Sequence, residues 1–154
     1  MAPRQSVLPF TYRAFFLILE PISALVGAFY AHFRQHEYLS LTTHTSSPPV
    51  PLGTSTILSQ LANLYFLFAL NEALVLRSTG DLRVWRTVLF VLLVADFGHL
   101  YSLQGLGSWV YWDVRQWNAI DYGNVAFVYL GATLRIAFLA GVGIGKPASI
   151  KKKA

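Results

Sequence analysis

The stretch TVLFVLLVADFGHLYSLQGL, residues 87–106, has the length that an α-helix needs to cross the hydrocarbon core of a bilayer, about 20 mostly apolar residues. Two ionisable side chains, Asp96 and His99, interrupt it one helical turn apart. Ionisable groups persist in membrane helices when they face a protein interior and find partners there. The stretch therefore predicts a transmembrane helix whose polar residues face other helices.

Three further apolar stretches have a similar length and a similar interruption. They cover about residues 14–33, 57–76 and 119–144, and they carry Glu20, Glu72 and Asp121, respectively. Charged residues make up only 12% of the 154 residues, against about 25% in soluble domains. The sequence predicts an all-α protein with a single membrane domain, residues 1–154, built as a bundle of four transmembrane helices.

Basic residues lie mostly at one end of this predicted bundle. Nine Lys and Arg flank the spans on the side of the two termini, whereas Arg34 and Arg115 lie on the other side, so the positive-inside rule predicts that both termini are cytosolic. The first stretch lacks a small-residue cleavage site and is expected to be a retained helix. The basic tail, residues 145–154, ends in Lys151–Lys152–Lys153–Ala154, which resembles a di-lysine retrieval signal. This predicts a multi-pass protein of the endoplasmic reticulum membrane; the alternative is a tail that only attracts anionic lipid.

Several classes of site are excluded by what the sequence lacks. There is no cysteine, so a disulfide, a thiolate metal site and a Cys nucleophile are impossible. His99 has no second His at metal-ligand spacing, and nucleotide-binding motifs are absent, so no metal and no cofactor are expected. The net charge of +5 comes mainly from span ends, which argues against nucleic acid as a partner. The expected partners are membrane lipid and a lipophilic small molecule, and a homodimer is left open.

Helical spacing gathers polar and small residues of three spans on single faces. The sets are Gln60, Asn63, Leu67 and Asn71 with Glu72 beside them in the second span; Glu20, Ser23, Gly27 and Ala31 in the first; and Asp121, Asn124, Val128, Gly131 and Arg135 in the fourth. Small residues on such a face allow a neighbouring helix to approach closely. We expect all of these faces to turn inward around one polar interior.

Arg135 is the only cation inside the predicted spans. Counted at about 1.5 Å per residue, it comes out near the middle of the membrane, level with Asp96. A buried arginine needs well hydrogen-bonded carboxylate partners to offset its desolvation. We expect Arg135 to pair with Glu20, Asp96 or Glu72.

Each polar residue also has a purely structural interpretation. Glu72 is close enough to the interface to snorkel or to pair with Arg77, and Asp121 is placed to cap the fourth helix. Intramembrane amides can simply hold helices together. The aromatic residues Trp109, Tyr111, Trp112, Trp117 and Tyr122 are typical of an interfacial belt, with Trp112 or Trp117 as a pocket lid in the alternative interpretation.

Five strings resemble a family of small fungal four-helix membrane proteins, most of which have no assigned function. They are Leu19–Glu20–Pro21, Gln60–Leu61–Ala62–Asn63–Leu64–Tyr65, Asp81–Leu82–Arg83–Val84–Trp85–Arg86, Asp96–Phe97–Gly98–His99–Leu100–Tyr101 and Asp121–Tyr122–Gly123–Asn124. The resemblance covers about residues 15–145. Two better-understood groups are similar in outline. The membrane epoxide hydrolases of fungal polyketide pathways, of the aurovertin and citreoviridin type, imply opening of polyene epoxides. The emopamil-binding and sigma-2-receptor superfamily, with which only carboxylate-bearing first and second spans are shared, implies a sterol-like ligand.

The expected function is acid/base chemistry on a lipophilic small molecule, with epoxide hydrolysis or epoxide-opening cyclisation in fungal secondary metabolism as its most specific form. A low-dielectric interior favours a neutral carboxylic acid and an arginine neighbour favours a carboxylate, so two carboxyl groups there can supply an acid and a base. The candidate catalytic residues are Asp96 with Glu20, His99 beside them, and Asp121 in reserve. The candidates for positioning substrate or water are Asn63, Tyr65, Asn124, Glu72 and Trp117, while Arg135 would hold one carboxylate ionised.

Two alternatives remain open at this point. One is a sterol- or terpenoid-binding membrane protein, either non-catalytic or of the isomerase type, which uses the same pocket. The other is a membrane scaffold or complex subunit whose polar residues hold helices or a partner together. A roomy interior lined by carboxylates would favour an enzyme or a binding protein, and a closed bundle with every carboxylate paired would favour a scaffold.

Overall fold

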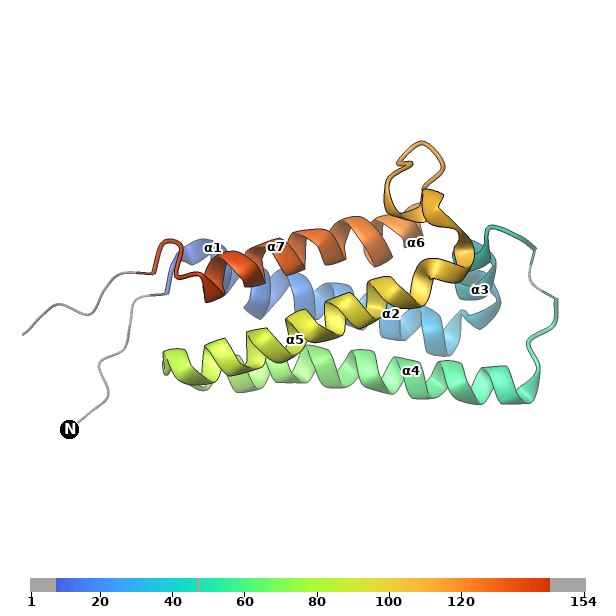
Figure 1. The fold of residues 1–154 in the computed structure, drawn as a ribbon. Coiled ribbons are helices and arrows are strands. Elements are labelled where there is room, and N and C mark those ends of the chain that lie inside the picture. Colours follow the sequence, from blue (N-terminus) through green and yellow to red (C-terminus); the bar gives the residue numbers. More distant parts are fainter. Residues whose placement is uncertain (1–7, 47, 145–154) are drawn as a thin grey trace, which may run out of the picture.

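Four helical segments in the computed structural model are long and apolar enough to cross a membrane: Phe10–Phe33, Leu52–Leu76, Leu82–Leu106 and Ala119–Leu139. The structure describes residues 8–46 and 48–144, and in these residues the regular elements are all helical. The segments run along one elongated bundle, and both ends of the described chain lie at the same end of it (Figure 1). The predicted all-α, four-span membrane protein is confirmed. The basic tail, residues 145–154, lies outside the described residues.

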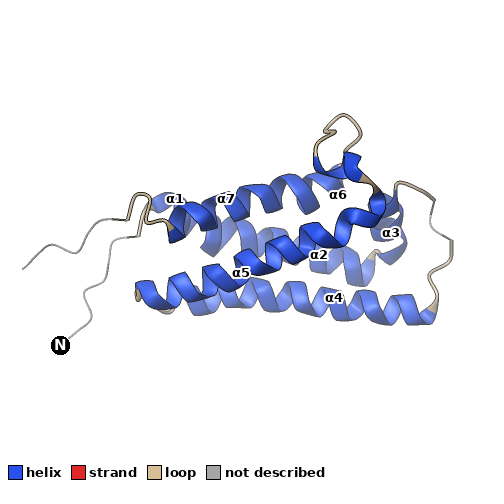
Figure 2. Cartoon of the chain, in the orientation of Figure 1, coloured by secondary structure: helices blue, strands red, loops and turns tan. Residues whose placement is uncertain are grey.

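The four spans are helices joined by loops (Figure 2). Each span combines α-helix with a wider or tighter helical turn. The first consists of α1 (Phe10–Ala14), the π-helical η1 (Phe15–Leu19) and α2 (Glu20–Phe33); the second of α4 (Leu52–Leu70) and the π-helical η2 (Asn71–Leu76); the third of α5 (Leu82–Ser102) and the 3₁₀ turn η3 (Leu103–Leu106); and the fourth of α6 (Ala119–Asp121), the π-helical η5 (Tyr122–Ala126) and α7 (Phe127–Leu139). A 3₁₀ turn, η4 (Ser108–Tyr111), lies between the last two spans.

The helix boundaries differ from the predicted ones for local reasons. The third span begins at Leu82 rather than at residue 87 because the carboxylate of Asp81 accepts a hydrogen bond from the Arg83 backbone N–H, at 2.8 Å, and caps the helix. The fourth helix ends at Leu139 rather than at residue 144. Gly141 and Gly143 follow it with φ of 83° and 70°, which only glycine adopts at little cost.

The loop predicted between the first two spans contains a helix, α3 (Gln35–Thr43). It lies across the end of the bundle opposite the chain termini (Figure 1), and His44 ends it in the left-handed conformation with φ of 56°. Tyr38 of α3 is buried against Ala31 of α2 and Leu58 of α4. We call this end of the bundle the α3 end and the opposite one the termini end.

The termini end is filled by aromatic side chains. We name Tyr12, Phe15, Phe16, Trp85 and Phe138 the aromatic plug; all five are buried and they contact one another across three spans. Edge-to-face and offset ring contacts of this kind add to the stability that burial of the rings provides. The plug joins the first, third and fourth spans at this end.

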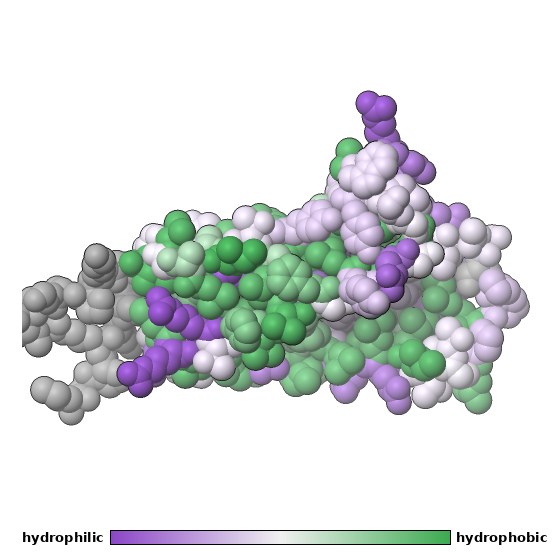
Figure 3. Space-filling view, viewed as in Figure 1, coloured by the Kyte–Doolittle hydropathy of each residue, from purple (hydrophilic) through white to green (hydrophobic). Residues whose placement is uncertain are grey.

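The sides of the bundle are apolar and exposed, as a bilayer requires. Large hydrophobic side chains such as Phe29, Phe90 and Val94 are more than half exposed. The space-filling view shows them along the length of the helices, with hydrophilic residues gathered mainly towards the two ends (Figure 3). A soluble protein rarely exposes so extensive an apolar surface.

Candidate functional site

Arg135 of α7 binds one carboxylate from each of the other three spans. Its Nη1 donates to Oδ2 of Asp96 at 2.7 Å, and its Nη2 donates to Oε1 of both Glu20 and Glu72, the latter at 3.3 Å. The guanidinium is 3% exposed. We call these four residues the charge cluster. The sequence predicted a pairing of Arg135 with one of these acids, and the structure brings all three to it.

The charge cluster contains three carboxyl groups but only one basic group, the Arg135 guanidinium. When all three carboxyl groups are ionised, the single guanidinium leaves two negative charges uncompensated in a buried site, which is costly. Glu20 and Glu72 converge on the same nitrogen, and like charges in such proximity favour one shared proton. Within the described residues, Glu20 Oε2, Glu72 Oε2 and Arg135 Nε are buried and make no hydrogen bond, so the two carboxyl oxygens are available to hold a proton and the Nε–H to donate a hydrogen bond.

Glycine at position 131 makes room for the guanidinium. A Cβ atom there would lie 2.7 Å from Nη1 of Arg135 and 3.4 Å from Oε1 of Glu20. The Arg135 side chain is flexible, but its end is held by three carboxylates, so it cannot move without losing at least one of those contacts.

We therefore expect Gly131→Ala to lower the free energy of unfolding by about 1–3 kcal/mol, the usual cost of overpacking, although alanine is the better helix former. Thermal unfolding of the purified protein in detergent measures the change. Gly98→Ala is the matched control, because a Cβ at Gly98 of α5 meets nothing within 4 Å and should be neutral or stabilising. Equal stability of the two variants would contradict the close fit at Gly131.

A cavity of about 520 Å³ opens from the charge cluster towards the α3 end. It lies between the pair formed by α2 and α4 and the pair formed by α5 and α7. Its volume is that of a typical small-molecule site, and most of its wall is apolar. The residues that line it are Glu20, Ser23, Ala24, Val26, Gly27, Tyr30, Glu37, Tyr38, Leu41, Tyr65, Phe68, Glu72, Leu92, Ala95, Asp96, His99, Ala119, Ile120, Gly123, Asn124, Phe127, Val128 and Arg135.

Most of the predicted site residues line this cavity. They are Glu20, Glu72, Asp96, His99, Tyr65, Asn124 and Arg135. His99 does not bond to Asp96; its Nε2 lies 3.1 Å from the backbone oxygen of Asn124. A neutral imidazole that donates this bond keeps its other nitrogen free to act as an acceptor.

Glu72 belongs to the charge cluster and does not pair with Arg77. Its side chain is 1% exposed, so it does not snorkel, and Nη2 of Arg77 donates instead to the backbone oxygen of Leu17 at 2.9 Å. The structural interpretation from the sequence is therefore wrong for this residue. Along the helix, Arg135 lies about 6 Å from the end of α7 at Leu139, and its side chain reaches Asp96.

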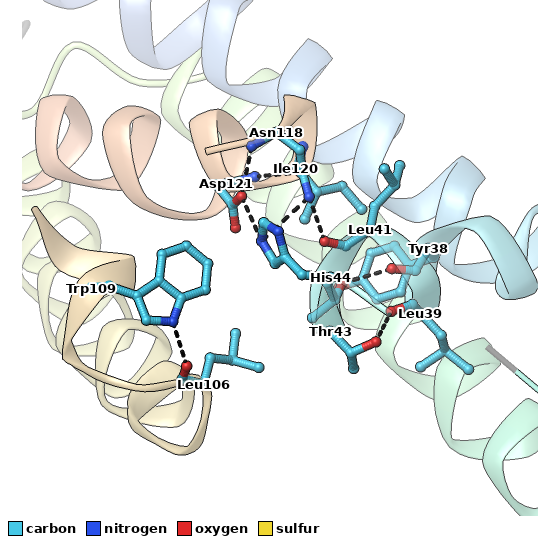
Figure 4. Close-up of polar contacts among 11 residues, drawn as sticks. Tyr38, Leu39, Leu41, Thr43, His44, Leu106, Trp109, Asn118, Ile120 and Asp121 are labelled. Carbon is cyan, nitrogen blue, oxygen red and sulfur yellow. Dashed lines mark hydrogen bonds and ion pairs between the residues drawn. The ribbon is translucent and has the colours of Figure 1, made fainter. Parts of the chain in front are cut away.

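Asp121 does not line the cavity. Its polar contacts are with Asn118 and His44 (Figure 4). Its Oδ2 accepts from the backbone N–H of Asn118 at 2.8 Å, in a capping box that starts the fourth span. The same oxygen lies 2.9 Å from Nε2 of His44, and the Asn118 amide donates to the backbone oxygen of Leu41 at 2.7 Å. These contacts fasten the end of α3 to the start of α6, so the geometry supports Asp121 as a cap and tether.

Two other predicted residues also lie away from the cavity. Gln60 and Asn63 are exposed on the outer side of α4, so the expectation that their helical face turns inward is wrong. Trp117 does not line the cavity; its ring lies edge-on to that of Tyr122, with centroids 5.5 Å apart. Neither Asn63 nor Trp117 is therefore placed to position a substrate in this site.

Sequence reasoning missed the residues of α3 that close the cavity. Glu37, Tyr38 and Leu41 all line it. Their i, i+1 and i+4 spacing was a signal for one helical face, but α3 is too short and too polar to stand out as a span.

Comparison with known protein families identifies the chain at the level of a family only. The model of a domain of unknown function, DUF7704, matches residues 5–145. The chain belongs to the DUF7704 family. The match covers all four spans of this DUF7704 chain, the charge cluster and the cavity. No curated protein and no solved structure matches the chain.

Proposed function

We propose that this protein is a membrane-embedded enzyme that performs acid/base chemistry on a lipophilic small molecule, with epoxide opening as the reaction. The observation that carries the proposal is the arrangement of three carboxyl groups on one arginine at the polar end of a largely apolar cavity. Epoxide opening needs an acid at the ring oxygen and a base at the attacking hydroxyl or water, and it needs no cofactor.

Exposure to the cavity separates the roles of the three carboxyl groups. The side chains of Glu20 and Asp96 are 15% and 13% exposed, whereas that of Glu72 is 1% exposed, so we assign the first two to direct contact with the substrate. Asp96 binds Nη1 through Oδ2 alone, and we assign it as the ionised base that acts through Oδ1. Glu20 shares a nitrogen of Arg135 with Glu72, so we assign Glu20 as the acid and Glu72 as the positioning residue behind it.

The proposed reaction is balanced without a further reactant. Glu20 donates its proton to the epoxide oxygen while one ring C–O bond breaks. A water molecule attacks that carbon and transfers a proton to Asp96, which gives a vicinal diol; an internal hydroxyl that attacks instead gives a cyclic ether. Proton transfer from Asp96 back to Glu20 or Glu72 restores the starting state, and the common contact with Arg135 supports such a transfer.

The cavity supports an enzyme or a binding protein over a scaffold. A scaffold would be expected to close its interior, whereas this bundle keeps about 520 Å³ beside its charged residues. The remaining alternative is a non-catalytic or isomerase-type protein for sterols or terpenoids. The excess of positive charge at the termini end supports a cytosolic orientation of that end, which we propose together with residence in the endoplasmic reticulum.

The direct test is turnover of lipophilic epoxides by the purified protein in H₂¹⁸O. We expect diols that carry one ¹⁸O atom, or cyclic ethers without it, at rates well above those of boiled protein, with mass spectrometry as the measurement. A panel of terminal, internal and polyene epoxides covers the substrate class. If no epoxide reacts, but members of the panel or sterols raise the unfolding temperature, the enzyme assignment fails in favour of the binding role.

A further inference from the structure

A second polar site lies at the α3 end of the cavity, away from the charge cluster. Tyr38 of α3 and Tyr65 of α4 both line the cavity, and their hydroxyl oxygens lie 3.1 Å apart. We call them the tyrosine pair. Two hydroxyl groups that share one hydrogen bond retain one donor proton and several acceptor lone pairs. Burial raises the pKa of Tyr38, so its hydroxyl stays protonated at neutral pH.

The protein holds the tyrosine pair in place from both sides. A Cβ atom at Gly27 of α2 would lie 3.3 Å from the Tyr65 ring, so glycine allows the ring to lie directly against the α2 backbone. Tyr38 is 8% exposed and packs against Ala31 and Leu58. The contacts of Asn118 and His44 with the end of α3 fix this helix over the cavity. The pair is therefore a preorganised polar group.

The charged side chains near the tyrosine pair are paired with each other. Glu37 also lines this end of the cavity, and its carboxylate forms an ion pair with Arg34 at 2.6 Å. Among the described residues, this ion pair leaves no free cation here to bind a ligand carboxylate, whereas a ligand hydroxyl can both donate to and accept from the tyrosine pair. The chemistry of this end therefore fits a neutral hydroxyl group.

The two polar ends of the cavity are separated by an apolar middle. Tyr65 and Glu72 lie seven residues apart on the second span, about 10 Å at 1.5 Å per residue. Phe68, Leu92 and Phe127 line the cavity as well and are apolar. We infer that the site takes an elongated lipophile with a neutral hydroxyl group about 10 Å from the group that meets the charge cluster, and that the tyrosine pair binds this hydroxyl. The identity of the reacting group rests on the proposed function; the binding of the far hydroxyl does not.

A matched set of three substrates tests this inference through turnover. They share a ten-carbon chain with a terminal epoxide and differ at the other end: 9,10-epoxydecan-1-ol, 1,2-epoxydecane and 9,10-epoxydecanoic acid. We expect the alcohol to have a KM about fivefold to tenfold below that of the plain epoxide, as one net hydrogen bond provides, with similar kcat. The acid should have the highest KM.

Tyr38→Phe and Tyr65→Phe should remove the advantage of the alcohol, so that its KM rises to about that of 1,2-epoxydecane measured in the same variant. Tyr101→Phe is the control, because Tyr101 is 70% exposed on α5 and does not line the cavity. Equal KM values for the alcohol and the plain epoxide in the unmodified protein would overturn the inference, whatever the variants do. So would equal losses for all three substrates in both tyrosine variants with intact unfolding temperatures.

A binding experiment keeps the inference testable if no epoxide reacts. Decane-1,10-diol can reach both polar ends, whereas decan-1-ol can reach only one. We expect the diol to raise the unfolding temperature at concentrations about fivefold to tenfold lower than decan-1-ol requires, and Tyr38→Phe to make the two alike. Equal potency in the unmodified protein overturns the inference. Absence of epoxide turnover with a preference for the diol overturns only the proposed reaction.

Discussion

Replacing Arg135 by methionine is expected to destabilise the fold more than any other single substitution in the cavity. Methionine keeps much of the side-chain volume but leaves Glu20, Glu72 and Asp96 without their cation in a buried site. Breaking a buried ion pair by removing one partner typically costs about 3–5 kcal/mol. We expect a large fall in the unfolding temperature and in the yield of monodisperse protein in detergent, as measured by thermal unfolding and size-exclusion chromatography.

Three further variants separate charge from packing. Arg86→Met removes an exposed arginine of α5 and should have little effect. Arg135→Lys keeps the positive charge but loses the planar guanidinium, whose two terminal nitrogens bind Asp96 and the two glutamates, respectively. We therefore expect an intermediate loss of stability. Adding Glu72→Gln to Arg135→Met should recover part of the stability, because fewer charges remain unpaired. Full stability of Arg135→Met alone would mean that the carboxyl groups are neutral without it, and our account of the charge cluster would be wrong.

Replacing Asp96 by asparagine is expected to abolish epoxide turnover while the protein remains folded. The asparagine oxygen can still accept the hydrogen bond from Nη1 of Arg135, but an amide cannot take a proton from the attacking water. General-base catalysis typically contributes about 10²–10⁴-fold, so kcat should fall by that factor. Glu20→Gln should cause a loss of similar size through the acid step, measured by the same ¹⁸O assay.

The control for Asp96→Asn and Glu20→Gln is the substitution of an acidic residue outside the cavity. Asp113 lies in the segment before the fourth span, where its carboxylate accepts from the Gln116 side chain at 2.6 Å, and Asp113→Asn should leave kcat unchanged. Ligand-induced thermal stabilisation of Asp96→Asn verifies that its cavity remains competent to bind. If Asp96→Asn and Glu20→Gln both retain full turnover, neither carboxyl group is catalytic and the acid/base assignment is wrong.

The charge cluster could be predicted from the sequence because the spans contain few carboxyl groups with which Arg135 could pair. Arg135 lies among apolar residues of the fourth span, and a buried arginine must find carboxylates. Helical periodicity also gathered Glu20 with Gly27, and Asn124 with Arg135, on faces that the structure turns towards the cavity. The structural interpretation of Glu72 failed, because its closeness to the end of the second span did not show whether its side chain turns towards Arg77 or towards Arg135.

Other parts of the site could not be predicted from periodicity. Helical spacing shows that Gln60 and Asn63 share a face of the helix, but it does not show whether that face meets another helix or the outside of the bundle. The position of Tyr38 depends on α3 folding back across the bundle, which requires the distant Asn118 and Asp121 to fasten its end. Contacts between residues so far apart in the chain leave no local pattern in the sequence.

The aromatic plug closes the bundle at its termini end, next to the charge cluster. Phe16, Trp85 and Phe138 are almost fully buried at the termini end, and the guanidinium carbon of Arg135 lies 5.5 Å from the centre of the Phe16 ring. A molecule that reacts at the cluster therefore cannot enter or leave through the termini end of the bundle.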